Sequence, residues 1–560
     1  MSHDLHESLR DNVRILGDSL GRTIADDLGQ SFVDKIETIR AHAKRGRQGD
    51  SLQQRQLIEY LRQLPERDLL PVTRAFNQFL NLANIAEQHY RARFRRVEDY
   101  KPGSQPALGE LLARAQQVGN SPRKLVETLA NMRVELVLTA HPTEVIRRTL
   151  IQKYDAIDEC LTAIESSEDY PERGARAQGR LEELISQAWH TDEIRHERPT
   201  PVDEAKWGFA VIENSLWQAV PDFHRDLDNL LLDTAGERLP LDAAPIRYAS
   251  WMGGDRDGNP NVTAKVTQEV LLLGRWMAAD LYLRDLEQLK TELSMWKANS
   301  ALKAEVGDVA EPYRELLKRL LTKMEATRDW AKAQLDGRNY DGGPIIETRD
   351  QIYAPLLACY RSLCDVGLDT IANGALLDTL RRVAVFGVTL TKLDLRQEAS
   401  RHAQVMEELT SSLGLGHYQE WSETQRQEFL LAELESRRPL IPRRWECSAE
   451  SREVIDTFKV IAQEHAEALG TYIISMAAEP SDVLTVALLM KEVGGQVTLP
   501  IAPLFETLND LDHAGDDARC RGSFAHQPAF GQCTIDPEAG QHFLDDLDHD
   551  LADEITDAQQ

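Results

Sequence analysis

The sequence predicts a predominantly helical protein built around parallel β/α units of the barrel class. Long segments carry apolar residues at helical spacing, as in Leu57, Leu61 and Leu64. Five short segments rich in strand-forming residues separate the helices. Polar or charged residues follow these short segments, and reactive residues lie at the C-terminal ends of the strands in a (β/α)8 barrel. Five strands are fewer than the eight that close such a barrel, so the sequence predicts a partial barrel.

The helical pattern covers most of the chain. From Glu7 to about Ala130 the apolar spacing predicts a first region of packed helices. Further helices are predicted for segments with abundant Leu, Glu, Arg and Gln, namely Arg147 to Ala188, Asp203 to Asp233, Thr267 to Trp296, Glu311 to Gln334, Gln351 to Cys364 and Ser451 to Glu467.

The predicted strands lie between these helices. They are Leu136 to Thr139, Ile246 to Tyr248, Val388 to Leu395, Tyr472 to Ser475 and Leu499 to Phe505. Strands separated by long helical insertions are typical of parallel β/α units, whose C-terminal strand ends meet at one edge. The residues expected at that edge include His141, Trp251, Asp255, Arg396 and Glu506.

We expect three regions along the chain. Residues 1–130 are expected to form an N-terminal helical region, and residues 131–511 the partial β/α barrel with helical insertions. After Glu506 the chain has thirteen Asp and Glu residues, two Arg residues and no Lys residue. Such a composition cannot bury a core, so residues 512–560 are expected to form an acidic, disordered tail.

Composition excludes several classes of function. The formal net charge of −28 argues against nucleic-acid or anionic-membrane partners, so any anion site needs a local cluster of Arg and Lys. No apolar run is long enough to span a membrane, and the first residues lack a secretion signal. The six cysteines form no C-x-x-C pair, which favours reduced structural thiols. A cytoplasmic protein is expected.

The first candidate site is the segment Thr139-Ala140-His141-Pro142-Thr143-Glu144, followed by Arg147 and Arg148. Pro142 disfavours a helical backbone at His141, so the imidazole is expected at an extended strand end. An imidazole beside two arginines could move protons near an anionic substrate. The alternative is a structural turn followed by a solvated pair of arginines.

The second candidate site is the turn from Trp251 to Asn261, which contains Gly253, Gly254, Asp255 and Arg256. Its Asp and Asn spacing imitates the start of a calcium-binding loop. The Gly and Glu that such a loop requires are replaced by Pro260 and Val266, so calcium is excluded. A Gly-rich turn lets backbone amides approach an anion, and the alternative is a tight turn without a ligand.

Two further residues complete the candidate set. Arg396, in Asp394-Leu395-Arg396-Gln397-Glu398, offers a planar fork of donors to a phosphate, or forms an ordinary salt bridge at a strand end. Glu506 could supply an oxygen ligand to magnesium or manganese, although one carboxylate is weak evidence for a metal.

The chain resembles bacterial phosphoenolpyruvate carboxylases. Beside the segments Thr139 to Glu144 and Gly253 to Pro260, the resemblance is carried by collinear motifs from about Leu9 to Asp516. They are QFLNLANIAEQ at Gln78 to Gln88, WHTDEIR at Trp189 to Arg195, VDEAKWGFAV at Val202 to Val211, LDLRQE at Leu393 to Glu398, SMA at Ser475 to Ala477, PSDVL at Pro480 to Leu484 and APLFETLNDL at Ala502 to Leu511.

The resemblance implies a largely helical protein around an eight-stranded β/α barrel, assembled as a homo-tetramer. It implies a lyase that joins phosphoenolpyruvate and bicarbonate into oxaloacetate and phosphate, fixing carbon dioxide for the tricarboxylic acid cycle with Mg²⁺ or Mn²⁺ and without biotin. By matching motif, His141 is the expected base and Arg396 the phosphate ligand. Glu506 is the expected metal ligand, and Trp251 with Gly253, Gly254, Asp255 and Arg256 is expected to line the site.

The resemblance ends at about Asp516. The YSDS-type and HGRGG-type segments of the family, which carry a second metal ligand, a lysine and further arginines, have no match in the remaining residues. We therefore expect a truncated chain with little activity of its own. The alternatives are a non-catalytic regulatory or assembly subunit and one half of a split enzyme.

Overall fold

The computed structural model describes residues 2–98, 108–118, 121–139, 147–167, 170–192, 199–495 and 499–507. The chain divides into two compact units. The first consists of Met1–Gly119 and Glu144–Arg198, and the second of Asn120–Thr143 and Pro199–Gln560. The predicted acidic tail, residues 512–560, lies outside the described residues.

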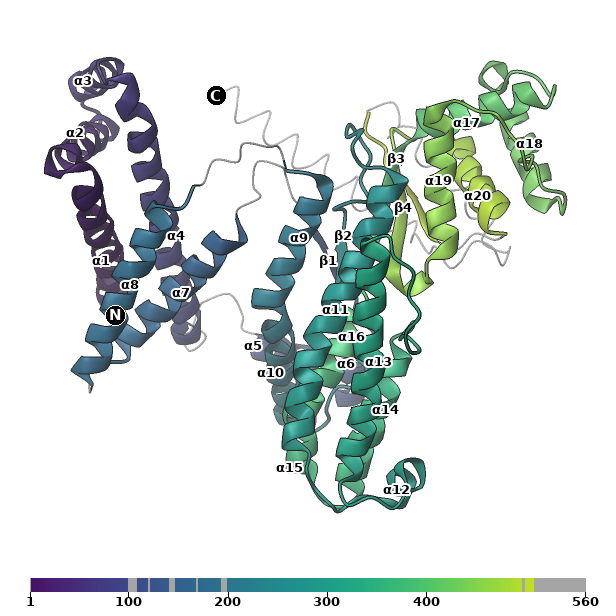
Figure 1. The fold of residues 1–560 in the computed structure, drawn as a ribbon, viewed down its shortest axis with the longest axis horizontal. Helices are drawn as coiled ribbons and strands as arrows, with labels where there is room; N and C mark the ends of the chain where they lie inside the picture. Colours follow the sequence, from purple (N-terminus) through teal and green to yellow (C-terminus); the bar gives the residue numbers. More distant parts are fainter. Residues whose placement is uncertain are drawn as a thin grey trace. The chain divides into compact units, whose positions relative to one another are not determined.

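The first unit is helical throughout its described part (Figure 1). Leu16 of α1, Leu82 of α4, Leu161 of α7 and Leu181 of α8 are buried in one core, which holds these helices together. The helices of the unit are α1 (Ser2–Leu28), α2 (Gln30–Arg47), α3 (Ser51–Arg62), α4 (Glu66–Glu98), α5 (Leu108–Gln117), α7 (Arg148–Glu165) and α8 (Pro171–Trp189).

Local sequence signals set the breaks between these helices. Gly29 has a φ of 86°, a left-handed conformation that separates α1 from α2. The Asp50 side chain accepts hydrogen bonds from the first backbone amides of α3. The helical segment predicted from Arg147 to Ala188 is two helices, because α7 ends at Glu165 and Pro171 begins α8.

The second unit is built on one parallel sheet. Its strands are hydrogen-bonded in chain order, β1-β2-β3-β4-β5. They are β1 (Val134–Leu138), β2 (Ile246–Ser250), β3 (Lys392–Glu398), β4 (Leu469–Ser475) and β5 (Ile501–Pro503). All five predicted strands are therefore present, and the described residues form an open sheet with no closure into a barrel.

Helical segments make every connection between these strands, as parallel strands require (Figure 1). Between β1 and β2 within this unit run α9 (Pro201–Val211), the π-helix η1 (Ile212–Leu216) and α10 (Trp217–Ala235), and α6 (Pro122–Asn131) precedes β1. Between β2 and β3 run α11 (Ala264–Glu292), α12 (Ser300–Val306), α13 (Pro312–Leu335), α14 (Asp350–Asp365), α15 (Asp369–Ile371), the π-helix η2 (Ala372–Leu376) and α16 (Leu377–Phe386). The later connections are α17 (Ala399–Ser412), the 3₁₀ turn η3 (Tyr418–Glu420), α18 (Glu423–Glu435), α19 (Ala449–Gln463), the 3₁₀ turn η4 (Ala466–Ala468) and, after β4, α20 (Pro480–Gly494).

Several predicted boundaries differ from the structure by a few residues, and three of them are instructive. The third strand was expected from Val388 but begins at Lys392, because Leu390 has a φ of 68° in the turn before it. The helix predicted to Trp296 ends at Glu292, and Trp296 is exposed. The helix predicted to Glu467 ends at Gln463, before the short turn η4.

Two apolar cores support the sheet. The larger joins β2 to the helices from α9 to α16, where Trp217 stacks on Phe386 and Phe386 stacks on Tyr248. The smaller joins β3 and β4 to α17, α19 and α20, and includes the stacked pair Phe458 and Tyr472. Because aromatic rings bury large areas, these stacks contribute strongly to holding helices on the sheet.

None of the described helices is both long and apolar enough to cross a membrane.

His402 is a buried titratable group in the smaller core. Its Nε2 lies 2.8 Å from the hydroxyl of Tyr472, and the ring is 1% exposed. Burial disfavours the charged imidazolium and lowers the pKa of His402 to about 3. The unfolded chain therefore binds a proton at this residue near pH 5, whereas the folded chain does not.

We expect the His402→Gln variant to be less sensitive to acid than the natural chain. The depressed pKa of His402 removes stability as the pH falls from about 6.5 towards 3, by about 2 kcal/mol at pH 5. Glutamine can still pair with Tyr472 but does not titrate. Urea unfolding at pH 7.5 and pH 5 measures the difference. An equal loss of stability in both chains would contradict the assignment.

Candidate active site at the carboxyl ends of the strands

The Gly-rich turn follows β2 directly and keeps the backbone of the sheet in register. The Trp251 amide donates to the carbonyl oxygen of Leu138 at 3.1 Å, which extends the pairing of β1 with β2. The amides of Gly254 and Asp255 both donate to the Trp251 carbonyl oxygen, at 2.9 and 3.0 Å. Gly253 has a φ of 81°, so the tight turn requires a residue without a β-carbon there.

The same turn is tied to the end of β3. The Arg396 amide donates to the Gly254 carbonyl oxygen at 3.0 Å, and the Arg256 amide donates to the Arg396 carbonyl oxygen at 2.9 Å. A β-carbon on Gly254 would lie 1.9 Å from the carbonyl oxygen of Asp394. Two different constraints therefore require the two adjacent glycines. Gly253 is required by its positive φ, and Gly254 by the close approach of two backbones.

Arg396 is held by carboxylates and by an indole ring. Its Nε and Nη2 donate to the two oxygens of Asp255 at 2.7 and 2.9 Å, and Nη2 lies 3.3 Å from Asp257 Oδ2. Its guanidinium lies over the Trp251 ring, 5.2 Å from the centroid. Burial lowers the pKa of Arg396, but the hydrogen bond and charge of Asp255, with the charges of Asp257 and Glu506, raise it overall. The guanidinium therefore stays charged.

Asp394 positions the indole beneath this guanidinium. Its Oδ2 accepts a hydrogen bond from Trp251 Nε1 at 3.2 Å, and its Oδ1 accepts one from the Thr471 amide at 2.8 Å. Burial raises the pKa of Asp394 above its usual range, although these hydrogen bonds oppose the shift. Asp394 was not among the predicted site residues. Its signal was the alternation along β3, which places Asp394 and Arg396 on the same face.

Arg256 is turned into the protein. It is 8% exposed, and its Nη1 and Nη2 donate to the Gly254 carbonyl oxygen at 2.9 Å and to Thr267 Oγ1 at 2.7 Å. Thr267 Oγ1 also donates to the Gly253 carbonyl oxygen at 2.7 Å. Burial lowers the pKa of Arg256. Its side chain therefore stabilises the glycine turn from the protein interior. The motif alone does not show that Arg256 points inward.

Glu506 follows β5 and is exposed. Its Oε2 accepts a hydrogen bond from the Met476 amide at 2.7 Å, which links the ends of β4 and β5. Met476 has a φ of 54°, a left-handed conformation that costs energy in a non-glycine residue and turns the chain sharply after β4. The carboxylate is thus fixed at the strand ends, and its charge acts on Arg396.

The carboxylate oxygens of Glu506 are the kind of ligand that a hard divalent cation prefers. Magnesium prefers oxygen ligands, keeps several waters and is commonly bound by one or two carboxylates together with substrate phosphates. Within the described residues there is no group of three or more His, Cys, Asp and Glu side chains that could hold a metal. Glu506 offers one carboxylate of the kind that such an ion binds.

The structure brings most of the predicted site residues together. Trp251, Gly253, Gly254, Asp255, Arg256 and Arg396 meet where β2 and β3 end. Glu506 lies at the end of β5, where its charge reaches Arg396. His141 lies outside the described residues. At the carboxyl ends of the parallel strands lie Arg396, its carboxylate partners and the exposed carboxylate of Glu506.

We expect Gly254→Ala to destabilise the second unit by about 3 kcal/mol, because the new β-carbon would overlap the backbone oxygen of Asp394. Gly343→Ala is the matched control, since a β-carbon there meets its nearest neighbour at 3.9 Å. Urea unfolding of both variants measures the effect. Equal stability of the two variants would show that the turn does not require Gly254.

The sequence of this chain is similar to those of known proteins. The family model described as phosphoenolpyruvate carboxylase matches residues 9–526. The phosphoenolpyruvate carboxylase of Chromohalobacter salexigens is 82% identical over 517 residues, which cover 92% of this chain and 59% of that protein. The protein of the same name from Marinobacter nauticus is 54% identical over 513 residues, which cover 92% of this chain and 58% of that protein.

A third relative, the phosphoenolpyruvate carboxylase of Ectopseudomonas mendocina, is 55% identical over 512 residues, which cover 91% of this chain and 58% of that protein. The chain thus spans less than two thirds of the length of these curated relatives. Both the family match and the identities extend across nearly the whole chain, which therefore belongs to the phosphoenolpyruvate carboxylase family.

Proposed function

We propose that this chain carries part of a site that joins phosphoenolpyruvate and bicarbonate into oxaloacetate and phosphate, a reaction that supplies the tricarboxylic acid cycle. The observation that carries the proposal is Arg396, a charged fork held over Trp251 at a strand end with Glu506 within electrostatic range. Membership of the family gives this arrangement its substrates.

In the proposed reaction a bicarbonate oxygen takes the phosphoryl group of phosphoenolpyruvate. The products of this step are carboxyphosphate and the enolate of pyruvate. Carboxyphosphate then breaks down to carbon dioxide and phosphate, and the enolate carbon attacks carbon dioxide to give oxaloacetate. The enolate must be protected from stray protons, because protonation would yield pyruvate instead.

Arg396 suits the phosphate group in this scheme. A guanidinium offers two parallel donors to a phosphate and does not lose its proton near neutral pH. In the structure Asp255 takes both of these donors. Substrate phosphate therefore exchanges with Asp255, or shares the guanidinium with it. Because the pKa of Arg396 is raised, largely through Asp255 once burial is offset, the group neutralises phosphate without acting as an acid near the enolate.

His141 and Glu506 take the remaining roles by motif. His141 accepts the proton of carboxyphosphate as carbon dioxide is released, which is ordinary general base chemistry for an imidazole. Glu506 would hold Mg²⁺ or Mn²⁺ through a carboxylate oxygen that is kept at the strand end by the Met476 amide. When bound, such an ion supplies positive charge that stabilises an enolate oxygen. The proposal requires no biotin.

The same proposal includes the setting of the enzyme. The family resemblance implies a tetramer of one chain, and we propose this assembly and a cytoplasmic location for this protein. We also retain the organisation into a helical region at 1–130, β/α units at 131–511 and an acidic tail at 512–560. The net charge of −28 supports the absence of nucleic-acid partners.

We expect Arg396→Gln to weaken phosphoenolpyruvate binding at least tenfold, because one charge-assisted fork is lost. Asp255→Asn should strengthen binding severalfold, since the competing carboxylate charge is removed. Arg338→Gln is the control, because Arg338 pairs with Asp336 in an exposed loop. Calorimetric titration of the 560-residue chain in magnesium buffer measures these affinities. Unchanged affinity in Arg396→Gln would refute the assigned role.

A fusion protein tests whether this chain supports the proposed carboxylation reaction. Residues 1–507 of this chain are joined to the corresponding remainder of the 82%-identical Chromohalobacter salexigens protein. We expect oxaloacetate formation from phosphoenolpyruvate and bicarbonate, followed by coupled oxidation of NADH. His141→Asn should lower this rate about 100-fold or more, as loss of a general base does. An active fusion that is insensitive to His141→Asn would rule out His141 as the base.

A further inference from the structure

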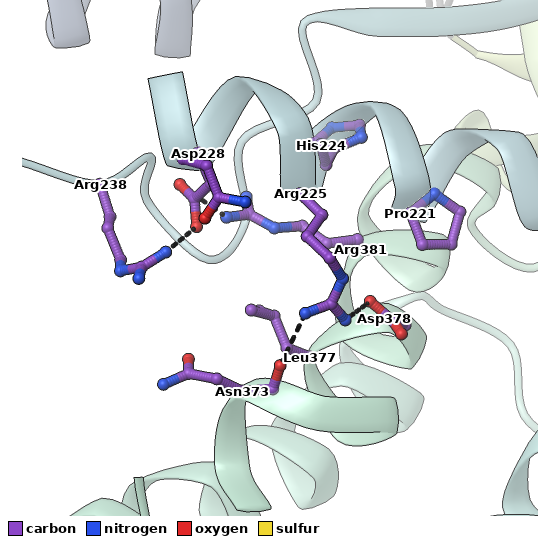
Figure 2. Close-up of a pocket in the computed structure, with 10 residues that line it drawn as sticks. Pro221, His224, Arg225, Asp228, Arg238, Asn373, Leu377, Asp378 and Arg381 are labelled. Atoms are coloured by element: carbon purple, nitrogen blue, oxygen red, sulfur yellow. Dashed lines mark hydrogen bonds and ion pairs between the residues drawn. The ribbon is translucent and has the colours of Figure 1, made fainter. Parts of the chain in front are cut away.

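A second charged pocket lies in the second unit, apart from the residues of the strand-end site. It has a volume of about 120 Å³ and is lined by α10, the loop after it, η2 and α16. Figure 2 shows arginines from three segments around it, namely Arg225 from α10, Arg238 from the following loop and Arg381 from α16. The role proposed for the strand-end residues uses none of them.

The three arginines are held in place by neighbouring acceptors. Arg225 pairs with Asp378, and its Nη1 donates to the Asn373 carbonyl oxygen at 3.0 Å. Arg238 Nη1 donates to Asp228 Oδ2 at 3.2 Å. These contacts, drawn in Figure 2, fix the guanidinium groups before any ligand arrives. A fixed donor loses little side-chain freedom on binding.

Arg381 has donor capacity to spare. It is 2% exposed, and within the described part of the chain its side chain makes one hydrogen bond, from Nη1 to the Pro240 carbonyl oxygen at 2.6 Å. Its Nη2 lies 3.6 Å from Asp228 Oδ1, which is an ion pair beyond hydrogen-bond distance. A guanidinium carries five N–H donors, and buried donors normally find partners. A ligand in the pocket would supply them.

The pocket carries more positive than negative charge. Three arginines face the two carboxylates Asp228 and Asp378. Burial lowers the pKa of His224, another lining residue, so its ring is neutral near pH 7. Burial also lowers the pKa of Arg381, as expected for a cation that its surroundings do not fully solvate. The pocket therefore has a local surplus of positive charge in a chain whose net charge is −28.

An irregular helical segment forms one wall of this pocket. Asn373 and Gly374 belong to the π-helix η2, and Gly374 departs from helical angles with a ψ of −138°. The Asn373 carbonyl oxygen is thereby available to Arg225. π-Helical turns inside α-helices occur frequently at functional sites.

We propose that this pocket binds a small tetrahedral oxyanion of the size of phosphate. Guanidinium groups from three segments suit an anion that presents oxygens in several directions, whereas a single fork suffices for a planar carboxylate. The volume of about 120 Å³ accommodates one such anion. The inference does not depend on the function proposed for the strand-end residues.

The test is a calorimetric titration of the 560-residue chain with sodium phosphate at constant ionic strength, with chloride as the balancing anion. Every chain carries Arg396→Gln, which removes the phosphate ligand proposed at the strand ends. We expect one phosphate to bind per chain. Adding Arg225→Gln should weaken binding about tenfold or more. Asp378→Asn should bind at least as tightly, because a repelling carboxylate is gone, and Arg338→Gln should have no effect.

Each outcome decides the proposal. Circular dichroism melting of every variant confirms folding, and Asp378→Asn provides the decision if Arg225→Gln does not fold. Absence of phosphate binding in the Arg396→Gln chain would overturn the proposal. So would equal weakening by Arg225→Gln and Arg338→Gln, or weaker binding by Asp378→Asn. Acetate is titrated in parallel, and acetate binding as tight as phosphate binding would overturn the tetrahedral assignment.

Discussion

The ion pair between Arg396 and Asp255 is the contact on which the strand-end site depends. It joins β3 to the turn after β2 through two hydrogen bonds, and the backbones on either side are bonded to each other as well. A partly buried charge pair of this kind is costly to break from one side, because the remaining partner keeps its desolvation penalty. Trp251 and Asp394 add a second layer beneath it, so the position of the guanidinium is determined from several directions.

Much of this fold could be predicted from the sequence, because strand and helix preferences are local. All five strands were found, and the error at the start of β3 arose because a single residue, Leu390, has a positive φ that the pattern does not reveal. The order of the strands also follows from their order in the chain. The resemblance implied an eight-stranded barrel, of which the sequence predicted five strands, and the described residues form an open sheet of five strands.

The candidate site was harder to predict, since it depends on contacts between distant segments. Adjacent residues of one motif point in different directions. Asp255 contacts Arg396, whereas Arg256 is directed into the protein. The periodicity of the sequence cannot tell which of the two side chains points inward, because a tight turn has no regular period. Asp394 was missed although its spacing from Arg396 placed both on one face of the strand. The arginine pocket had no sequence signal at all, because its walls come from α10 and α16.

The length of the connection between β2 and β3 bears on how the protein folds. Asp255 and Arg396 are 141 residues apart, and the helices from α11 to α16 occupy the interval. Bringing such distant residues together carries a loop entropy cost, and contacts of long sequence separation slow folding. We therefore expect the helical insertion to pack first and Arg396 to meet Asp255 late. During synthesis, the turn after β2 leaves the ribosome before β3, its partner strand, has been synthesised.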